Sequence, residues 1–121
     1  MDIRKLNKEF MVCKVRDFSQ VDLDDEFVFL GKTDEEKSVV CTTSLMPKNV
    51  LEYENGWYGF RIEGVLDFSL VGILAKISSL LAERGISIYA VSTFNTDYIF
   101  IKKEKYDEAL DTLSCNGYSI K

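Results

Sequence analysis

The sequence contains no histidine, so it lacks the side chain that most often acts as a general base or binds a metal. It also lacks the Cys-x-x-Cys, P-loop and Gly-x-Ser-x-Gly motifs of metal, nucleotide and serine-nucleophile chemistry. The acidic run Asp34-Glu35-Glu36 has no partner at metal-site spacing, and a solvated surface is the simpler interpretation. These absences disfavour an enzyme. We expect no catalytic residue, no metal and no cofactor.

Positive charge is also scarce. The chain has 15 Lys and Arg against 20 Asp and Glu, and the basic residues form no cluster. Because nucleic acids and anionic membranes attract basic surfaces, we expect neither as a partner. No apolar run approaches the roughly 18 residues of a membrane helix. The start, MDIRKLNKEF, has no signal-peptide core. The sequence therefore predicts a cytoplasmic protein.

Cysteine and proline are rare, with three and one residues in a chain of 121. Cys13 and Cys41 lie in apolar runs and Cys115 stands apart, so we expect buried free thiols rather than a structural disulfide. Apolar residues make up 46% of the chain, which is enough for a folded core. The length allows one compact domain or two very small ones.

The C-terminal half has clear periodicity. Alternating apolar residues in WYGFRIEG predict a strand that ends at Gly64. Apolar residues then recur at helical spacing over residues 70–81. Asp67 or Ser69 is a candidate N-cap of this helix, and Gly85 is placed to end it in a left-handed conformation. A strand followed by a helix is therefore expected between residues 57 and 85.

The rest of this half predicts two strands, a helix and a short strand. ISIYAVSTF and YIFIKK are rich in β-branched and aromatic residues, and Asn95-Thr96-Asp97 is a turn signal between them. Tyr106 to Leu113 have helical spacing, Gly117 ends that helix, and YSI is the last strand. The order is βαββαβ, the ferredoxin-like plan of an α+β protein, with both helices on one face of a four-stranded antiparallel sheet.

The N-terminal half predicts strands without a long helix. FMVCKV, EFVFLGK and SVVCTTSL are strand-like, and NVLEYENG is a further strand candidate that ends at the turn Glu54-Asn55-Gly56. Pro47 is expected to interrupt a connection. About 56 residues hold a separate core only with difficulty, so these strands should pack with the C-terminal unit. We place the boundary between residues 1–56 and 57–121.

Two stretches carry a resemblance to a known family. LDFSLVGILAKISSLLAERGISIYAVSTF and NTDYIFI resemble the ACT domain, a βαββαβ regulatory module that binds small ligands, usually amino acids. TDEEKSVV, residues 33–40, is similar to a segment of small tandem ACT proteins of bacteria, which are related to aspartate kinase regulatory regions and to cytosolic arginine sensors. The resemblance implies a reduced, mostly β ACT-like unit at 1–56 and an ACT domain at 57–121. It implies a non-catalytic, amino-acid-binding regulatory protein that forms a homodimer.

The resemblance also implies a ligand site. The N–H groups at the start of the first helix would bind the carboxylate of the ligand, and Gly72 would let the ligand approach the backbone. Asp97 would accept a hydrogen bond from the ligand ammonium. Where arginine-binding relatives have an acidic residue this chain has Leu70, which disfavours arginine. Lys37 replaces a residue that is usually apolar. The full set carried over is Asp67, Ser69, Leu70, Val71, Gly72, Ile73, Thr93, Phe94, Asp97, Ser38 and Val39.

Simpler interpretations stay open for these residues. Gly72 could mark only a close crossing of a helix and a strand, Asp97 only a turn, and Thr93 only a strand position. The alternative function is a module for protein–protein interaction or dimerisation without a small ligand. The sequence leaves open whether a ligand site lies within one chain, between its halves or between two chains.

Overall fold

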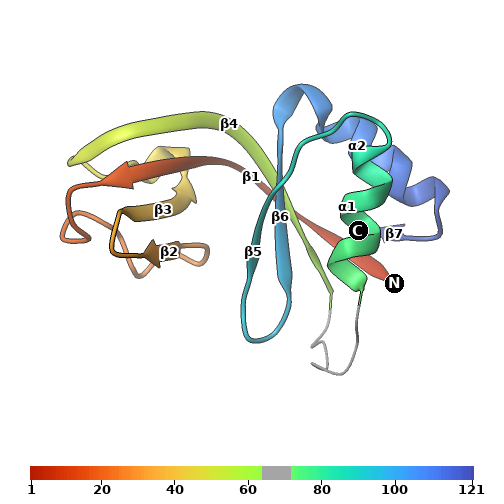
Figure 1. Ribbon diagram of the computed structural model, residues 1–121, viewed down its shortest axis with the longest axis horizontal. Coiled ribbons are helices and arrows are strands. Elements are labelled where there is room, and N and C mark those ends of the chain that lie inside the picture. Colours follow the sequence, from red (N-terminus) through yellow and green to blue (C-terminus); the bar gives the residue numbers. More distant parts are fainter. Residues whose placement is uncertain (64–71) are drawn as a thin grey trace. The chain divides into compact units, whose positions relative to one another are not determined.

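The computed structural model describes residues 1–63 and 72–121. By contacts the chain divides into two compact units: unit 1 comprises Met1–Asn7 and Tyr58–Lys121, and unit 2 comprises Lys8–Trp57. Two long strands, β1 (Asp2–Val15) and β4 (Val50–Ile62), contribute residues to both units (Figure 1). The domain boundary at residue 56 stays a prediction, but Met1–Asn7 group with the C-terminal residues. No helix in the described ranges is long and apolar enough to cross a membrane.

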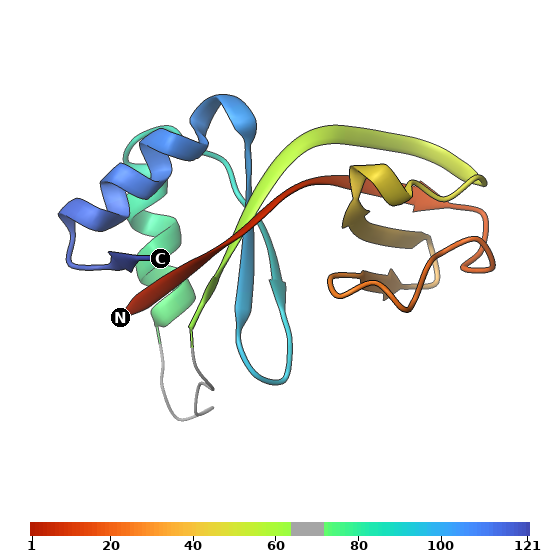
Figure 2. The same ribbon diagram turned by 180° about the vertical axis from the view of Figure 1, so that it is seen from behind.

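Unit 1 contains two helices and the ends of the long strands. After β4 come α1 (Ile73–Ala82), β5 (Tyr89–Ser92), β6 (Asp97–Lys102), α2 (Lys103–Cys115) and β7 (Ser119–Ile120). This element order is the βαββαβ order predicted from the sequence. Both views of the ribbon place α1 and α2 together on one side of the strands of this unit (Figures 1 and 2).

The strand order of unit 1 differs from the predicted sheet. The hydrogen-bonded order is β7-β1-β4-β6-β5, so the start of β1 lies between β4 and β7. The prediction of four antiparallel strands is therefore wrong: a fifth strand is inserted, and β7 pairs with it in parallel, Ile120 opposite Ile3. Residues 10–15 of β1 were predicted as a strand, but residues 2–9 were missed because Asn7 adopts φ 59°, which breaks the apolar alternation expected of a strand.

The predicted turn at Glu54-Asn55-Gly56 is also wrong. β4 runs without interruption from Val50 to Ile62, through all three of these residues. Gly56 has φ 82°, a conformation that glycine adopts without the steric cost of a Cβ. A left-handed glycine inside a strand is typical of a local irregularity rather than of a chain reversal. Gly56 therefore marks an irregularity within β4 and not the end of a strand.

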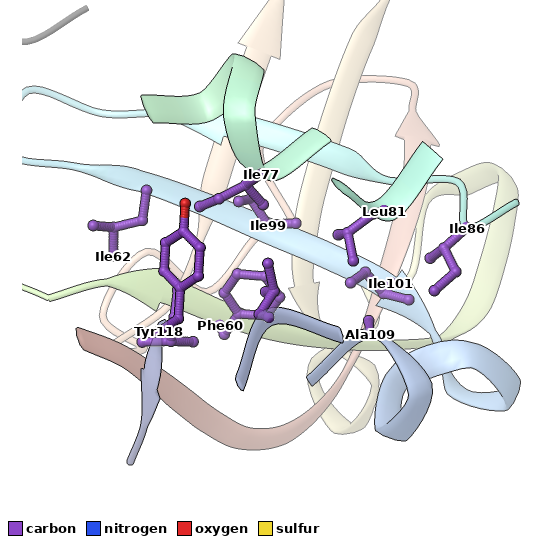
Figure 3. Close-up of a cluster of buried hydrophobic side chains, with 11 residues drawn as sticks. Phe60, Ile62, Ile77, Leu81, Ile86, Ile99, Ile101, Ala109 and Tyr118 are labelled. Atoms are coloured by element: carbon purple, nitrogen blue, oxygen red, sulfur yellow. The ribbon is translucent and has the colours of Figure 1, made fainter. Parts of the chain in front are cut away.

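The core of unit 1 lies between the helices and the strands. Ile77 and Leu81 of α1 are fully buried, and their side chains point towards β6 (Figure 3). Ile73, Leu74 and Leu80 pack against the same cluster, so the apolar stripe predicted for this helix is confirmed over these positions. The fully buried members from the other elements are Ile3, Phe60, Ile62, Ile99, Ile101, Ala109 and Leu113.

The ends of α1 correct one prediction and confirm another. The N-cap is Gly72, with φ 80° and no side-chain cap, so capping of this helix by Asp67 or Ser69 is wrong. Asp67 and Ser69 themselves lie outside the described residues. Gly85 has φ 71°, and the N–H of Ile86 donates to the carbonyl oxygen of Leu81 at 3.0 Å. This bond, five residues back, is the Schellman ending that a left-handed glycine allows.

Unit 2 is almost entirely β-structure. β2 (Phe29–Lys32) and β3 (Lys37–Thr42) are followed by a single 3-10 turn, Thr43–Leu45, and Pro47 lies in the connection to β4 as predicted. The strand order is β2-β3-β1-β4, with β3 antiparallel to both β1 and β2. Its core contains Met11, Val15 and Val39 together with Cys13 and Cys41, both buried and free. The expectation of buried thiols without a structural disulfide is confirmed for this pair.

Candidate functional site

The N-cap residue of α1, Gly72, has no side chain that could cap the helix. The first helical hydrogen bond runs from the N–H of Lys76 to the carbonyl oxygen of Gly72 at 2.8 Å, which leaves the N–H groups of the first turn without helical acceptors. No side chain in residues 1–63 and 72–121 caps this end, and no acidic residue lies in the first turn. The described residues therefore do not compensate the partial positive charge of the terminus, and such a terminus favours an anion.

Gly72 has open space around its Cα among the described residues. A Cβ built on Gly72 would meet no described atom within 4 Å. Among the described residues nothing therefore supports the simpler interpretation, in which the glycine permits a close helix–strand crossing. The positive φ of 80° explains why glycine occupies the position.

A cavity of about 280 Å³ adjoins this terminus. Gly72 and Ile73, two of the predicted ligand residues, line it. Lys76 lines it as well, and within residues 1–63 and 72–121 its ammonium group has no ion-pair partner. The helix terminus and the lysine both bring positive potential to one small space. The remaining lining residues are Met1, Asn116, Gly117 and Tyr118.

Sequence reasoning missed the contribution of Lys76 and of the chain segment after α2. Lys76 follows Gly72 by one helical turn, so it is the first polar residue on the same face of α1, and this spacing was a usable signal. Asn116 to Tyr118 reach the cavity only because β7 pairs with β1 and returns the C-terminus to this end of the unit. No local pattern in the sequence predicts that pairing.

The turn between β5 and β6 lies at the same end of unit 1 as the start of α1 (Figures 1 and 2). Thr93 closes the turn: its N–H and its hydroxyl each donate to the carbonyl oxygen of Thr96 at 2.9 Å. The buried hydroxyl of Thr96 donates to the carbonyl oxygen of Ile62 at 2.7 Å. The turn is thus fixed to the end of β4. The sequence had assigned the stabilising role to Asn95 and Asp97, whereas the two threonines perform it.

One of the two carboxylate oxygens of Asp97 forms a hydrogen bond within unit 1. It is the first residue of β6, is half-buried, and accepts a hydrogen bond from the Ser92 hydroxyl on Oδ1 at 2.6 Å. The directly paired Cα positions of Ser92 and Asp97 place both side chains on one face of the strand pair. Within the described part of the chain, Oδ2 has no hydrogen-bond partner. Phe94, at the tip of the turn, is 80% exposed.

The other predicted site residues lie elsewhere or outside the described ranges. Ser38 and Val39 belong to β3 in unit 2, where Val39 is 1% exposed and packs in the core. The Ser38 hydroxyl donates to the carbonyl oxygen of Gly31 at 3.5 Å. Their participation in one site with unit 1 stays a prediction. Asp67, Ser69, Leu70 and Val71 lie outside the described residues.

Comparison with known proteins identifies the class. A family model described as the ACT domain matches residues 52–115, more than half of the chain, and the chain therefore belongs to the ACT-domain family. The match begins inside β4, five residues before the boundary predicted from the sequence. Among curated proteins, none matches the chain.

Solved structures share the fold over nearly the whole chain. A structure from Agrobacterium tumefaciens is 27% identical, with a TM-score of 0.84, and the match covers 99% of this chain and 91% of that one. Aspartate kinase from Synechocystis is 17% identical with a TM-score of 0.71, and the match covers 99% of this chain but 27% of the kinase chain. The regulatory subunit of aspartate kinase from Thermus thermophilus is 12% identical with a TM-score of 0.58, covering 88% and 89%.

Proposed function

We propose that this protein is a non-catalytic regulatory ACT protein of the cytoplasm that binds an amino acid at the start of α1. The observation that carries the proposal is the uncapped terminus at Gly72, which adjoins the cavity containing Lys76. The regulatory role is supported by membership of the ACT-domain family and by the likeness to a regulatory subunit of aspartate kinase.

The two charged ends of an amino acid fit two features of unit 1. The ligand carboxylate would accept hydrogen bonds from the first-turn N–H groups that follow Gly72, with Lys76 adding a charge-assisted bond. The ligand ammonium needs an acceptor, because a charged group is costly to remove from water unless it is paired. The Oδ2 atom of Asp97 is available for that role, since Ser92 occupies Oδ1. We propose Thr93 and Phe94 as neighbouring contacts.

The rest of the proposed site comes from the resemblance. We retain Ile73, the first residue of α1, as a ligand contact, together with the preceding residues Asp67, Ser69, Leu70 and Val71. Ser38 and Val39 are proposed as contacts from the ACT-like unit of the same chain or of a second copy. We also propose a homodimer, which light scattering after size-exclusion chromatography measures directly. A monomer with an intact amino-acid site would remove the homodimer and the between-chain version of the site, but not the binding proposal.

Thermal-shift measurements with each of the twenty amino acids test the binding proposal. A ligand present at one hundred times its Kd should add about 2.7 kcal/mol to the free energy of unfolding, a readily measured rise in Tm. Because Leu70 disfavours a cationic side chain, arginine should not give the largest shift. If no amino acid raises the Tm, the sensor function is wrong.

Variants at Asp97 and Lys76 then locate the site. Asp97→Ala should weaken binding of the identified amino acid by about tenfold or more, because a charged hydrogen-bonded pair is lost. Ser92→Ala removes the hydroxyl that bonds Asp97 but keeps the carboxylate, so it separates loss of charge from loss of positioning. Asp111→Ala, on an exposed position of α2, is the control. Unchanged affinity in Asp97→Ala and Lys76→Gln would place the ligand elsewhere.

The second candidate is an interaction module without a small ligand. The observation that favours it is Phe94, which presents an aromatic ring that is 80% exposed at the tip of the β5–β6 turn. Phe94→Ser should dissociate a dimer or a partner complex if this function is right. If Phe94→Ser leaves the oligomeric state unchanged while an amino acid raises the Tm, the first candidate is preferred.

A further inference from the structure

A second cavity of unit 1 shares no lining residue with the candidate amino-acid site. It has a volume of about 410 Å³, within the range of about 300–1,000 Å³ that small-molecule sites occupy. It lies beside the first two turns of α2, and β1 and β4 form its other walls. The lining residues are Lys5, Asn7, Tyr58, Lys103, Tyr106, Asp107 and Leu110.

Two tyrosines form a fixed aromatic wall. The ring centroids of Tyr58 and Tyr106 are 5.6 Å apart, with the ring planes tilted by 36°. The hydroxyl of Tyr106 donates to the carbonyl oxygen of Gly59 at 2.9 Å, which holds this ring in place. Burial raises the pKa of Tyr106, so the phenol stays neutral. Leu110 is half-buried beside the rings. The two rings thus present an aromatic surface in which Tyr106 is held in place.

Two lysines line the same cavity. Lys5 in β1 is half-buried, Lys103 is the first residue of α2, and neither forms an ion pair within the part of the chain that the structure describes. Other lysines of this unit are paired: Lys105 lies 3.6 Å from Glu108, and Lys121 lies 2.7 Å from Asp2. Lys5 and Lys103, which have no ion-pair partner among the described residues, therefore line the same cavity as the two tyrosines.

The balance of charge around this cavity favours an anion. Lys5 and Lys103 contribute two positive charges, and the exposed carboxylate of Asp107 contributes one negative charge. The start of α2 has no side-chain cap, although Glu104 lies in its first turn. Aromatic rings attract flat apolar groups, and lysine ammonium groups bind carboxylates and phosphates as point charges. The combination suits one class of ligand.

We propose that this cavity binds a small molecule with a planar apolar body and one anionic group. The planar body packs on Tyr58 and Tyr106, and the carboxylate or phosphate lies between the ammonium groups of Lys5 and Lys103. This site does not depend on the amino-acid site at Gly72. The protein would then have a second small-molecule site, and binding at each site would not depend on binding at the other.

The test uses indole-3-acetate and phenyl phosphate as probes of the two anionic groups, with indole-3-acetamide as the uncharged control. Each is titrated into the full ¹⁵N-labelled chain, and amide shifts are followed by NMR. We expect saturable shifts at Lys5, Lys103 and Tyr106, and clearly weaker binding of the acetamide. Whichever anionic probe binds more tightly distinguishes a carboxylate ligand from a phosphate ligand.

Variants make the result decisive. Lys5→Gln and Lys103→Gln should each weaken binding of the tighter-binding anionic probe several-fold. The double variant should weaken it by about tenfold or more. Lys105→Gln, on the same helix but ion-paired with Glu108, should leave binding unchanged. An unchanged Tm verifies that each variant folds. The proposal is overturned if no probe gives saturable shifts, if the acetamide binds equally well, if the lysine variants have no effect, or if the shifts appear at Gly72 and Lys76 instead.

Discussion

The hydroxyl of Thr96 donates a hydrogen bond of 2.7 Å to the carbonyl oxygen of Ile62, and this buried bond fixes the β5–β6 turn to the end of β4. The side chain of Thr96 is 7% exposed, so water cannot easily replace the bond. Ile62 is the last residue of β4, and Asp97 directly follows Thr96. The bond therefore ties the position of the Asp97 carboxylate to the strand that precedes α1.

Thr96→Val tests this relationship. The valine keeps the shape of the side chain but leaves the Ile62 carbonyl oxygen without its partner, which should cost about 1–3 kcal/mol in the free energy of unfolding. Urea denaturation measures the change. Thr112→Val is the matched control: Thr112 is also buried, but its hydroxyl bonds the carbonyl oxygen of Glu108 within α2, so a smaller loss is expected. Equal losses in the two variants would show that the bond to β4 has no special value.

Gly59→Ala should destabilise unit 1 by overpacking. A Cβ at Gly59 would lie 2.7 Å from the ring of Phe100 and 3.0 Å from a methyl group of Leu6. Because the Phe100 ring is fully buried, it cannot move without disturbing its neighbours, and about 1–3 kcal/mol should be lost. Gly31→Ala is the control, since Gly31 is exposed and its added Cβ would meet only the Ser38 hydroxyl, at 3.3 Å. Chemical denaturation of both variants gives the comparison.

The three cysteines should differ sharply in reactivity. Cys115 is exposed, whereas Cys13 and Cys41 are buried. A hydrogen bond from the Cys41 thiol lowers the pKa of Cys13, and the same contact together with burial raises the pKa of Cys41. Mass spectrometry after brief iodoacetamide treatment at neutral pH should find a single modified residue, Cys115, and unfolding in denaturant should expose all three. Rapid modification of Cys13 in the folded protein would show that unit 2 opens readily.

The carboxyl group of Asp2 should titrate below its usual range. A hydrogen bond from the Lys121 ammonium at 2.7 Å, and the lysine charge, lower its pKa from 3.8. A carboxylate whose pKa is depressed by folding stabilises the protein above the unfolded value, and the contribution is lost as the pH falls through the folded value. NMR titration of Asp2 should therefore give a midpoint below 3.8. Lys121→Gln should return it towards 3.8, whereas Lys105→Gln should not.

The local elements of unit 1 could be predicted from the sequence because their signals are local. Apolar residues spaced three and four apart in α1, β-branched and aromatic runs in β5 and β6, and Gly85 after the helix all act within a few neighbouring residues. The start of the helix was predicted less well: the periodicity indicated residues 70–81 with Asp67 or Ser69 as the N-cap, whereas α1 begins at Ile73 and its N-cap is Gly72. One local signal misled: Gly56 takes a positive φ within a strand rather than in a turn.

The candidate site could be predicted only in part. Gly72, Ile73, Thr93 and Asp97 came from a resemblance and from the chemistry of helix termini, and unit 1 brings the β5–β6 turn and the start of α1 to one end. Lys76 could have been found from its spacing to Gly72. The bond from Thr96 to Ile62 could not, because it joins positions 34 residues apart in the chain.

The sequence by itself determined which segments of unit 1 become helices and strands, because backbone propensity and apolar periodicity act over short distances. Only the tertiary structure decided that the start of β1 lies between β4 and β7, because strand pairing depends on backbone hydrogen bonds that carry little side-chain information. That pairing brings Met1 and Tyr118 to the cavity at Gly72, and Lys5 and Asn7 to the cavity beside α2. The makeup of both cavities thus follows from a long-range pairing.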